Sequence, residues 1–193
     1  MFRALIHRLQ SIGLPAHAPA ISRRCWRFDP ASLLRGLPAL GCVLYLPMRP
    51  CSAGVEEMPR GLLVEDMRLM PLLQTHWLVS ASVIGVDGPR EWIECVDRDG
   101  HLCARLHLLP DTDYLAWDAL LASGGPPMTV PQGRWPQHVR PACAQLLRFR
   151  LRRLAGLSVL AGETSLSVST LSQQLAGQVA GAEAIPLQMT ADG

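Results

Sequence analysis

Histidine and arginine are the side chains of this sequence best suited to binding a ligand. Lysine is absent, so all 18 basic side chains are guanidinium groups, whose planar forks of donors suit carboxylates and phosphates. The six histidines include no H-x-x-x-H pair, which argues against a dedicated zinc site. A single histidine can nevertheless hold a haem iron, because that metal needs only one axial imidazole.

Three groups of these residues are candidates for binding, and each has a plain structural alternative. His76 lies beside Trp77 at the start of a predicted strand, where a structural or surface role is the alternative. Arg105 and His107 share one side of another predicted strand, which could equally be a solvated sheet face. A close run of arginines either flanks a solvated helix or supplies one or two forks to an anionic ligand. The run comprises Arg148, Arg150, Arg152 and Arg153.

Several reaction classes lack their sequence signatures. The sequence contains no G-x-S-x-G, no G-x-G-x-x-G after a strand and no G-x-x-x-x-G-K-[ST]. A hydrolase, a dinucleotide enzyme and a P-loop protein are therefore unsupported. The six cysteines form no C-x-x-C pair and are interpreted as reduced core residues of a cytoplasmic protein. They are Cys25, Cys42, Cys51, Cys95, Cys103 and Cys143.

Length and charge predict one ordinary domain with a real core. The chain has 193 residues, of which 49% are hydrophobic, and its formal charge of +2 is too small to attract nucleic acid. Residues 164–182 carry no charge but are rich in Ser, Thr and Gln, so membrane insertion is not expected. Residues 1–27 contain five arginines and no acid, which we interpret as an N-terminal arm or a short amphipathic helix rather than a targeting peptide.

The elements that must position these residues begin with a capped helix. Asp29 followed by Pro30 predicts a helix start, and the apolar stripe behind it ends near Pro38. Residues 42–46 are predicted to form a buried strand, and residues 48–61 a loop or irregular hairpin. Residues 77–86, 91–96 and 102–108 alternate like strands and are joined by turns, the second of them at 97–100. These three strands predict an antiparallel meander.

The C-terminal half is predicted to be mainly helical. A helix capped by Asp111 or Thr112 extends through Ala122 and is followed by a Pro/Gly linker over 124–137. Pro141 is expected to open a helix over 141–156, and a weaker helix covers 166–182, before a short strand at 185–189. Strands in a run with helices before and after them indicate an α+β fold, an antiparallel meander flanked by N- and C-terminal helices.

Several segments, taken in order, resemble one family. Residues 92–100, 102–108 and 113–120 are similar to the "LQFFD-x-x-G-x-AVHKVYL…D-x-x-AWDAL" block of the HemS/HmuS/ChuX haemin-degrading and haem-trafficking proteins. Residues 33–44 resemble the family's "LLxALPxLGxVMxLTRN" segment, and residues 66–69 with His76-Trp77 resemble "IDLRIFxxHW". The tail is loosely similar over 146–162 and 185–189. The resemblance thus extends over about residues 28–193.

The resemblance implies a long antiparallel sheet flanked by helices, in a family whose full-length members have two such halves. This chain is similar to the first half and the opening of the second, so we expect an arm at 1–27, a haem-handling domain at 28–137, and C-terminal helices with the start of a second half at 138–193. The family's axial histidine lies in a segment beyond Gly193. The family's "HK" pair appears here as Ala104-Arg105, which keeps the positive charge.

What the resemblance implies is a cytoplasmic haem-binding protein of haem utilisation, with haem as its ligand or substrate. The expected roles are His76 as iron ligand, Arg68 and Arg105 as propionate contacts, and Trp77 as a packing surface for the ring. Binding or trafficking of haem is favoured over degradation, which would need an external electron donor. The alternative is a non-catalytic relative that has lost haem binding and acts as an interaction or regulatory protein. A homodimer formed through an open sheet edge is a further expectation.

Overall fold

The described chain starts with a strand and a capped helix. The computed structural model describes residues 20–49, 59–85, 88–129, 139–165 and 167–188. Strand β1 (Ser22–Arg27) precedes α1 (Pro30–Gly36), and the Asp29 carboxylate accepts hydrogen bonds from the N–H groups of Ala31 and Ser32. The predicted helix start at Asp29 is confirmed. The last residues of the expected arm form a strand instead, and the short helix considered near the start of the arm, over residues 1–12, lies outside the described residues.

The predicted meander is confirmed as the middle of a larger sheet. Strands β2 (Cys42–Pro47), β4 (Trp77–Gly85), β5 (Gly88–Val96) and β6 (Leu102–His107) lie where the sequence predicted strands, and β4, β5 and β6 pair antiparallel in sequence order. The full strand order is β1-β4-β5-β6-β2-β7-β8-β3, with β9 beside β7. Two pairings are parallel, β3 (Leu62–Val64) with β8 and β7 with β9 (Leu187–Gln188). The fold is therefore α+β, but its sheet is mixed and nine-stranded rather than a simple meander.

The helix predicted over 141–156 was wrong. These residues contain β7 (Ala144–Leu154) and the turn that leads into β8 (Leu157–Thr164), with which β7 forms a hairpin. Leu147 and Phe149 are buried while Arg148 and Arg150 are exposed, which is the two-residue period of a strand. Pro141 favours a helix start, but the alternation that follows it decides the structure. The weaker helix is confirmed as α4 (Thr170–Ala182), capped by Ser169.

The connector between β6 and α3 uses three polar side chains in different ways. Asp113, not Asp111 or Thr112, caps α3 (Tyr114–Ala122) by accepting from the Ala116 N–H at 2.9 Å. The Asp111 carboxylate accepts instead from the Ser169 N–H at 2.6 Å and so holds the start of α4. Thr112 is buried and donates to the Cys42 carbonyl at 2.6 Å.

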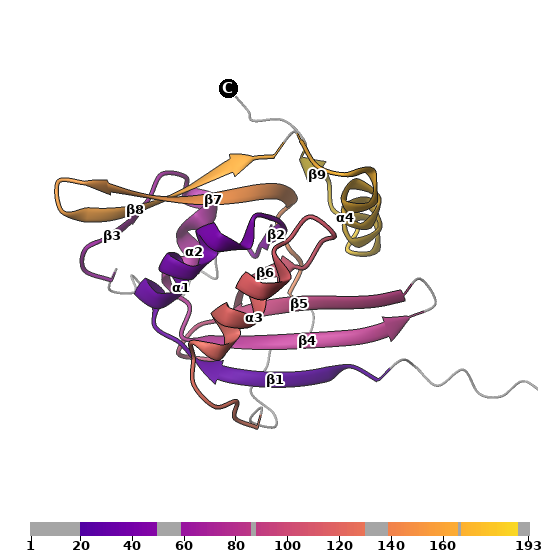
Figure 1. The fold of residues 1–193 in the computed structure, drawn as a ribbon, viewed down its shortest axis with the longest axis horizontal. Coiled ribbons are helices and arrows are strands. Elements are labelled where there is room, and N and C mark those ends of the chain that lie inside the picture. The colour runs from indigo at the N-terminus through magenta and orange to yellow at the C-terminus, as the bar shows by residue number, and fades with distance from the viewer. Residues whose placement is uncertain (1–19, 50–58, 86–87, 130–138, 166, 189–193) are drawn as a thin grey trace, which may run out of the picture.

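Helices pack on both faces of the sheet and create two apolar cores. The α3 face carries α1, α3, the short α2 (Met70–Leu73) and the 3-10 turns η2 (Leu37–Leu40) and η3 (Met67–Leu69), packed on Leu78, Ile93 and Leu106 among others. The α4 face carries α4 on Leu44, Leu46 and Leu146. Figure 1 shows α1, α2 and α3 grouped together and α4 apart from them beside β9.

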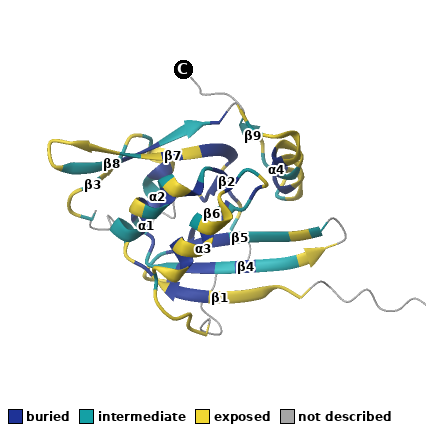
Figure 2. Ribbon diagram, in the orientation of Figure 1, coloured by how far each residue is buried: buried dark blue, intermediate teal, exposed yellow. Residues whose placement is uncertain are grey.

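Burial is greatest where strands run beneath helices, and the far end of the β7–β8 hairpin is exposed (Figure 2). The cysteines that the structure describes are buried and form no disulfide with one another, as predicted, and Cys51 lies outside these residues. Within the described ranges, every helix is too short or too polar to cross a membrane.

Candidate functional site

The four residues predicted to bind haem do not form one site. Arg105 lies on β6 between Ala104 and Leu106, which point into the core of the α3 face, so its own side chain points to the α4 face. Trp77 packs against the core of the α4 face and therefore shares this face with Arg105. The strand register places Trp77 beside Val96 on β5, two positions along from the Glu94–Arg105 pair.

Arg68 lies on the other side of the sheet. Its backbone carbonyl accepts a hydrogen bond from the hydroxyl of Tyr45, which belongs to the core of the α3 face. The exposed guanidinium pairs with Asp66 at 2.6 Å and donates to the Gln188 side chain at 3.1 Å. The side-chain hydrogen bond from Arg68 is the main reason that the pKa of Asp66 is lowered. Arg68 and Arg105 therefore cannot contact the two propionates of one haem in this arrangement.

His76 precedes β4 with both ring nitrogens engaged. Nδ1 lies 3.0 Å from the Gln74 carbonyl oxygen, and Arg98 donates from Nε to His76 Nε2 at 2.6 Å. The carbonyl requires a proton on Nδ1, which leaves Nε2 as the lone-pair nitrogen. This is the tautomer that a metal ligand needs, but Arg98 would first have to release the lone pair.

A second histidine occupies the face on which Arg105 lies. His107 and Trp92 are directly opposite each other on β6 and β5, with their rings stacked at a centroid distance of 5.8 Å and an angle of 25°. Arg105 and Glu94 are the next opposite pair, and the Trp92 Nε1–H donates to Glu94 Oε1 at 3.1 Å. We call this group the α4-face cluster. It consists of Arg90, Trp92, Glu94, Arg105 and His107.

Oxygen atoms of α4 and its C-cap meet both arginines of the α4-face cluster. Arg105 donates from Nη1 to Glu183 Oε1 at 2.7 Å, and its Nε lies 3.7 Å from Glu94 Oε1. Arg90 donates to Gln178 Oε1 at 3.0 Å. The Arg105 side chain is only 17% exposed, so this guanidinium is largely withdrawn from water and depends on its carboxylate partners.

The environment of His107 keeps its imidazole neutral. Burial, and then the positive charges of Arg105 and Arg90, lower the pKa of His107 to about 3. Its Nε2 atom is enclosed and has no hydrogen-bond partner among the described residues. A buried polar atom without a partner is uncommon in folded proteins and often marks a functional position. A neutral imidazole is also the form that binds a metal.

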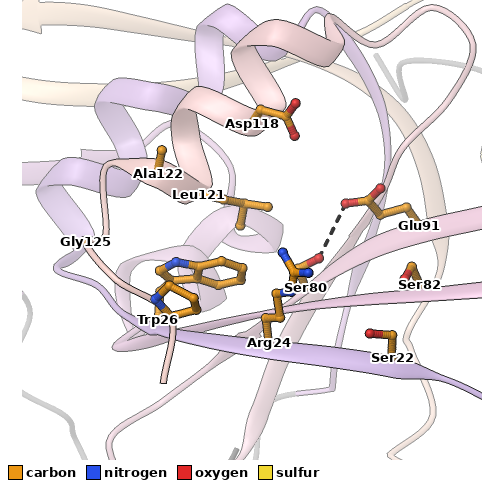
Figure 3. Close-up of a pocket in the computed structure, with 11 residues that line it drawn as sticks. Ser22, Arg24, Trp26, Ser80, Ser82, Glu91, Asp118, Leu121, Ala122 and Gly125 are labelled. Atoms are coloured by element: carbon orange, nitrogen blue, oxygen red, sulfur yellow. Dashed lines mark hydrogen bonds between the residues drawn. The ribbon is translucent and has the colours of Figure 1, made fainter. Parts of the chain in front are cut away.

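Two hollows flank the sheet. The first lies beside Arg105, has a volume of about 340 Å³ and is lined by Val139, Arg140 and the end of α4 from Ala182 to Ala184. The second, which we call the α3 cleft, lies between α3 and strands β1, β4 and β5 and measures about 520 Å³ (Figure 3). Both volumes fall in the range of roughly 300–1,000 Å³ that small-molecule sites occupy. Neither is lined by His76.

Sequence reasoning named Arg105 and Trp77, which lie on this face, but did not name Arg90, Trp92 or Glu94 as binding residues. It placed Arg105 and His107 on one strand face, for which a solvated sheet face was the alternative. The signal that could have shown otherwise is α4 itself, whose small buried residues Ala176, Val179 and Ala180 suit close packing on a sheet. Trp92 and Arg90 became neighbours of His107 only through the β5–β6 register.

Comparisons with known proteins find similarity only among solved structures. No family model matches the sequence, and no curated protein matches it either. Among solved structures, the chain is similar to the heme-degrading enzyme ChuS of Escherichia coli O157:H7, with a TM-score of 0.38, 18% identity, and coverage of 61% of this chain and 39% of that one. It is also similar to holo-PhuS, a heme-binding protein from Pseudomonas aeruginosa, with a TM-score of 0.36, 19% identity, and coverage of 60% and 39%. The matched part spans about 39% of the length of these two proteins.

Proposed function

We propose that the protein binds haem on the α4 face of its sheet. The observation that carries this proposal is the α4-face cluster, in which a neutral, unpartnered imidazole stacks on an indole between two guanidinium groups. Haem needs a nitrogen lone pair for its iron and cations for its propionates, and the cluster supplies both. The proposed ligand agrees with the family that residues 92–120 resemble.

Each residue of the cluster has a distinct role in the proposed complex. His107 holds the iron through Nε2, and Trp92 supports the imidazole by stacking on it. Arg105 and Arg90 bind the propionates in place of the Glu183 carboxylate and the Gln178 amide oxygen, which occupy the same donors in the structure. Trp77 borders this face and limits access of water to it. Bound haem would supply an iron centre, and the residues of the cluster would hold the haem in position.

Under this proposal His107 replaces His76 as the expected iron ligand. His76 is the competing candidate, because its tautomer is suitable and only Arg98 blocks its Nε2. Arg68 has no role in binding, since it lies on the α3 face. We propose binding or transfer of haem within the cytoplasm rather than cleavage, which would require electrons from a separate donor.

Titration of the full chain with haemin tests the proposal. The expected result is a sharp Soret shift that saturates near one equivalent and is lost in His107→Phe, which keeps an aromatic ring against Trp92 but removes the lone pair. His76→Phe should retain the shift. His101→Phe serves as the control, because His101 is exposed in the turn between β5 and β6.

Three other outcomes would each overturn part of the proposal. Loss of the shift in His76→Phe alone would assign the iron to His76 and remove the α4-face cluster from binding. Saturable binding that survives both variants would place haem elsewhere. Loose uptake without saturation by the unaltered chain would instead support the alternative, a relative that has lost haem binding and acts through a protein partner.

A further inference from the structure

The α3 cleft is independent of the proposed haem site and lies on the opposite face of the sheet. Its floor is formed by neighbouring strands in a defined register, with Ser22 opposite Ser82 and Arg24 opposite Ser80. Glu91 lies opposite Ser82 on the next strand, and α3 forms the roof with Asp118. The floor is therefore an ordered array of polar side chains beneath a helix, where apolar packing would be the usual arrangement.

Opposite charges face this cleft without neutralising one another. Arg24 and Asp118 have no hydrogen bond or ion pair with another described residue. Glu91 is held in place, because its Oε1 accepts from the Trp117 Nε1–H at 2.9 Å and from the Ser80 hydroxyl at 3.4 Å. Figure 3 shows Arg24 rising from β1 between Trp26 and Glu91, with Asp118 above.

One end of the cleft is apolar. Trp26, Leu121 and Ala122 line it, and Leu121 projects from α3 above the indole of Trp26 (Figure 3). A ligand that fills the cleft would thus meet an apolar surface at one end, a guanidinium in the middle and two carboxylates beyond it. The serine hydroxyls can donate or accept hydrogen bonds between these points.

The combination of charges excludes several ligand classes. A divalent cation is disfavoured because Arg24 lies among the acids, and a phosphate is disfavoured because the two carboxylates repel a dianion. A sugar would need an exposed aromatic ring to stack on, whereas Trp26 is only 7% exposed. A molecule with one carboxylate, one ammonium group and an apolar side chain satisfies all three regions at once.

We propose that the α3 cleft binds a small zwitterion, an α-amino acid with an apolar side chain. Its carboxylate pairs with Arg24, its ammonium group with Asp118 and Glu91, and its side chain lies against Trp26 and Leu121. Arginine suits the first contact because its fork binds a carboxylate through two parallel hydrogen bonds. The hydroxyls of Ser22 and Ser82 complete the polar contacts.

Calorimetric titration of the full chain with leucine tests this inference. We expect saturable binding of leucine, and affinities about tenfold lower for 4-methylpentanoate, which lacks the amino group, and for isoamylamine, which lacks the carboxylate. Arg24→Gln and Asp118→Asn should each weaken leucine binding to a similar extent. Arg27→Gln is the matched control, because Arg27 is exposed on the same strand and does not line the cleft.

The outcomes separate this inference from the proposed function. If leucine and phenylalanine both fail to saturate, or if the amine-free or carboxylate-free analogue binds as well as leucine, the cleft is not a zwitterion site. If Arg27→Gln weakens leucine binding as much as Arg24→Gln does, the cleft is likewise not a zwitterion site. Haemin binding should be unchanged in Arg24→Gln, so failure of either proposal leaves the other intact.

Discussion

Arg105 on β6 donates from Nη1 to Glu183 Oε1 at 2.7 Å, and this ion pair joins the sheet to the C-cap of α4. The Glu183 side chain is 30% exposed and the Arg105 side chain 17% exposed, so the contact is partly shielded from water. A carboxylate supplied by the chain itself therefore occupies the position in which the proposed function requires a carboxylate of the ligand. Glu183 and a haem propionate must compete for the same guanidinium.

Glu183→Gln is predicted to tighten haemin binding by about tenfold, because the amide keeps a hydrogen-bond acceptor but removes the competing charge. The measurement is the dissociation constant from Soret titration at constant ionic strength. Glu163→Gln is the matched control, since Glu163 also accepts a hydrogen-bonded ion pair from an arginine, Arg150 at 2.8 Å, but lies on β8 outside the α4-face cluster. An equal or weaker affinity of Glu183→Gln would contradict the proposed competition.

The pH dependence of stability is predicted to reveal the lowered pKa of His107. Its pKa is lowered from 6.5 to about 3 in the folded protein. Between these pH values the imidazole is protonated in the unfolded chain and neutral in the folded one. The free energy of unfolding should therefore fall as pH drops below 6.5 toward 3, by up to about 1.4 kcal/mol per pH unit. Above pH 6.5 the imidazole is neutral in both states and contributes no slope.

His107→Phe should remove this part of the slope, which urea unfolding at pH 7.0 and 5.5 can measure before most carboxylates begin to titrate. The quantity compared is the change in unfolding free energy between the two pH values, in the variant and in the unaltered chain. A change in overall stability caused by the substitution does not affect this difference. If the variant and the unaltered chain lose stability equally between these pH values, His107 is protonated normally in the folded state. The electrostatic basis of the proposed site would then be wrong.

The elements that the sequence predicted correctly were those with a local sequence signal. Asp29-Pro30 and the alternation of residues 102–108 are local patterns, and they correctly predicted α1 and β6. The alternation at 147–152 was equally local, but Pro141 favoured a helix start, and a helix was predicted in place of β7. Both patterns were present in the sequence, and the period of two was the stronger one.

The site could not be predicted in the same way, because it depends on contacts between distant residues. The pairing of Trp92 with His107 requires the register of two strands, and that of Arg105 with Glu183 spans 78 residues. A shift between Cys95 and Val96 also changes the register near the turn, so Leu102 packs in the core of the α4 face although Ala104 and Leu106 pack in the other. A bulge of this kind has no reliable sequence signature.

Thr112 is predicted to stabilise the junction between β2 and the segment that follows β6. It is 4% exposed, donates to the Cys42 carbonyl at 2.6 Å and accepts from the Leu109 N–H at 2.9 Å. Thr112→Val has nearly the same shape but leaves both backbone groups buried without a partner, which should lower the free energy of unfolding by roughly 2–4 kcal/mol. Thr112→Ser keeps the hydroxyl and should lose much less, so thermal unfolding of the two variants separates the hydrogen bonds from the packing. A larger loss in Thr112→Ser than in Thr112→Val would mean that the methyl group, rather than the hydroxyl, holds β2 to the start of α3.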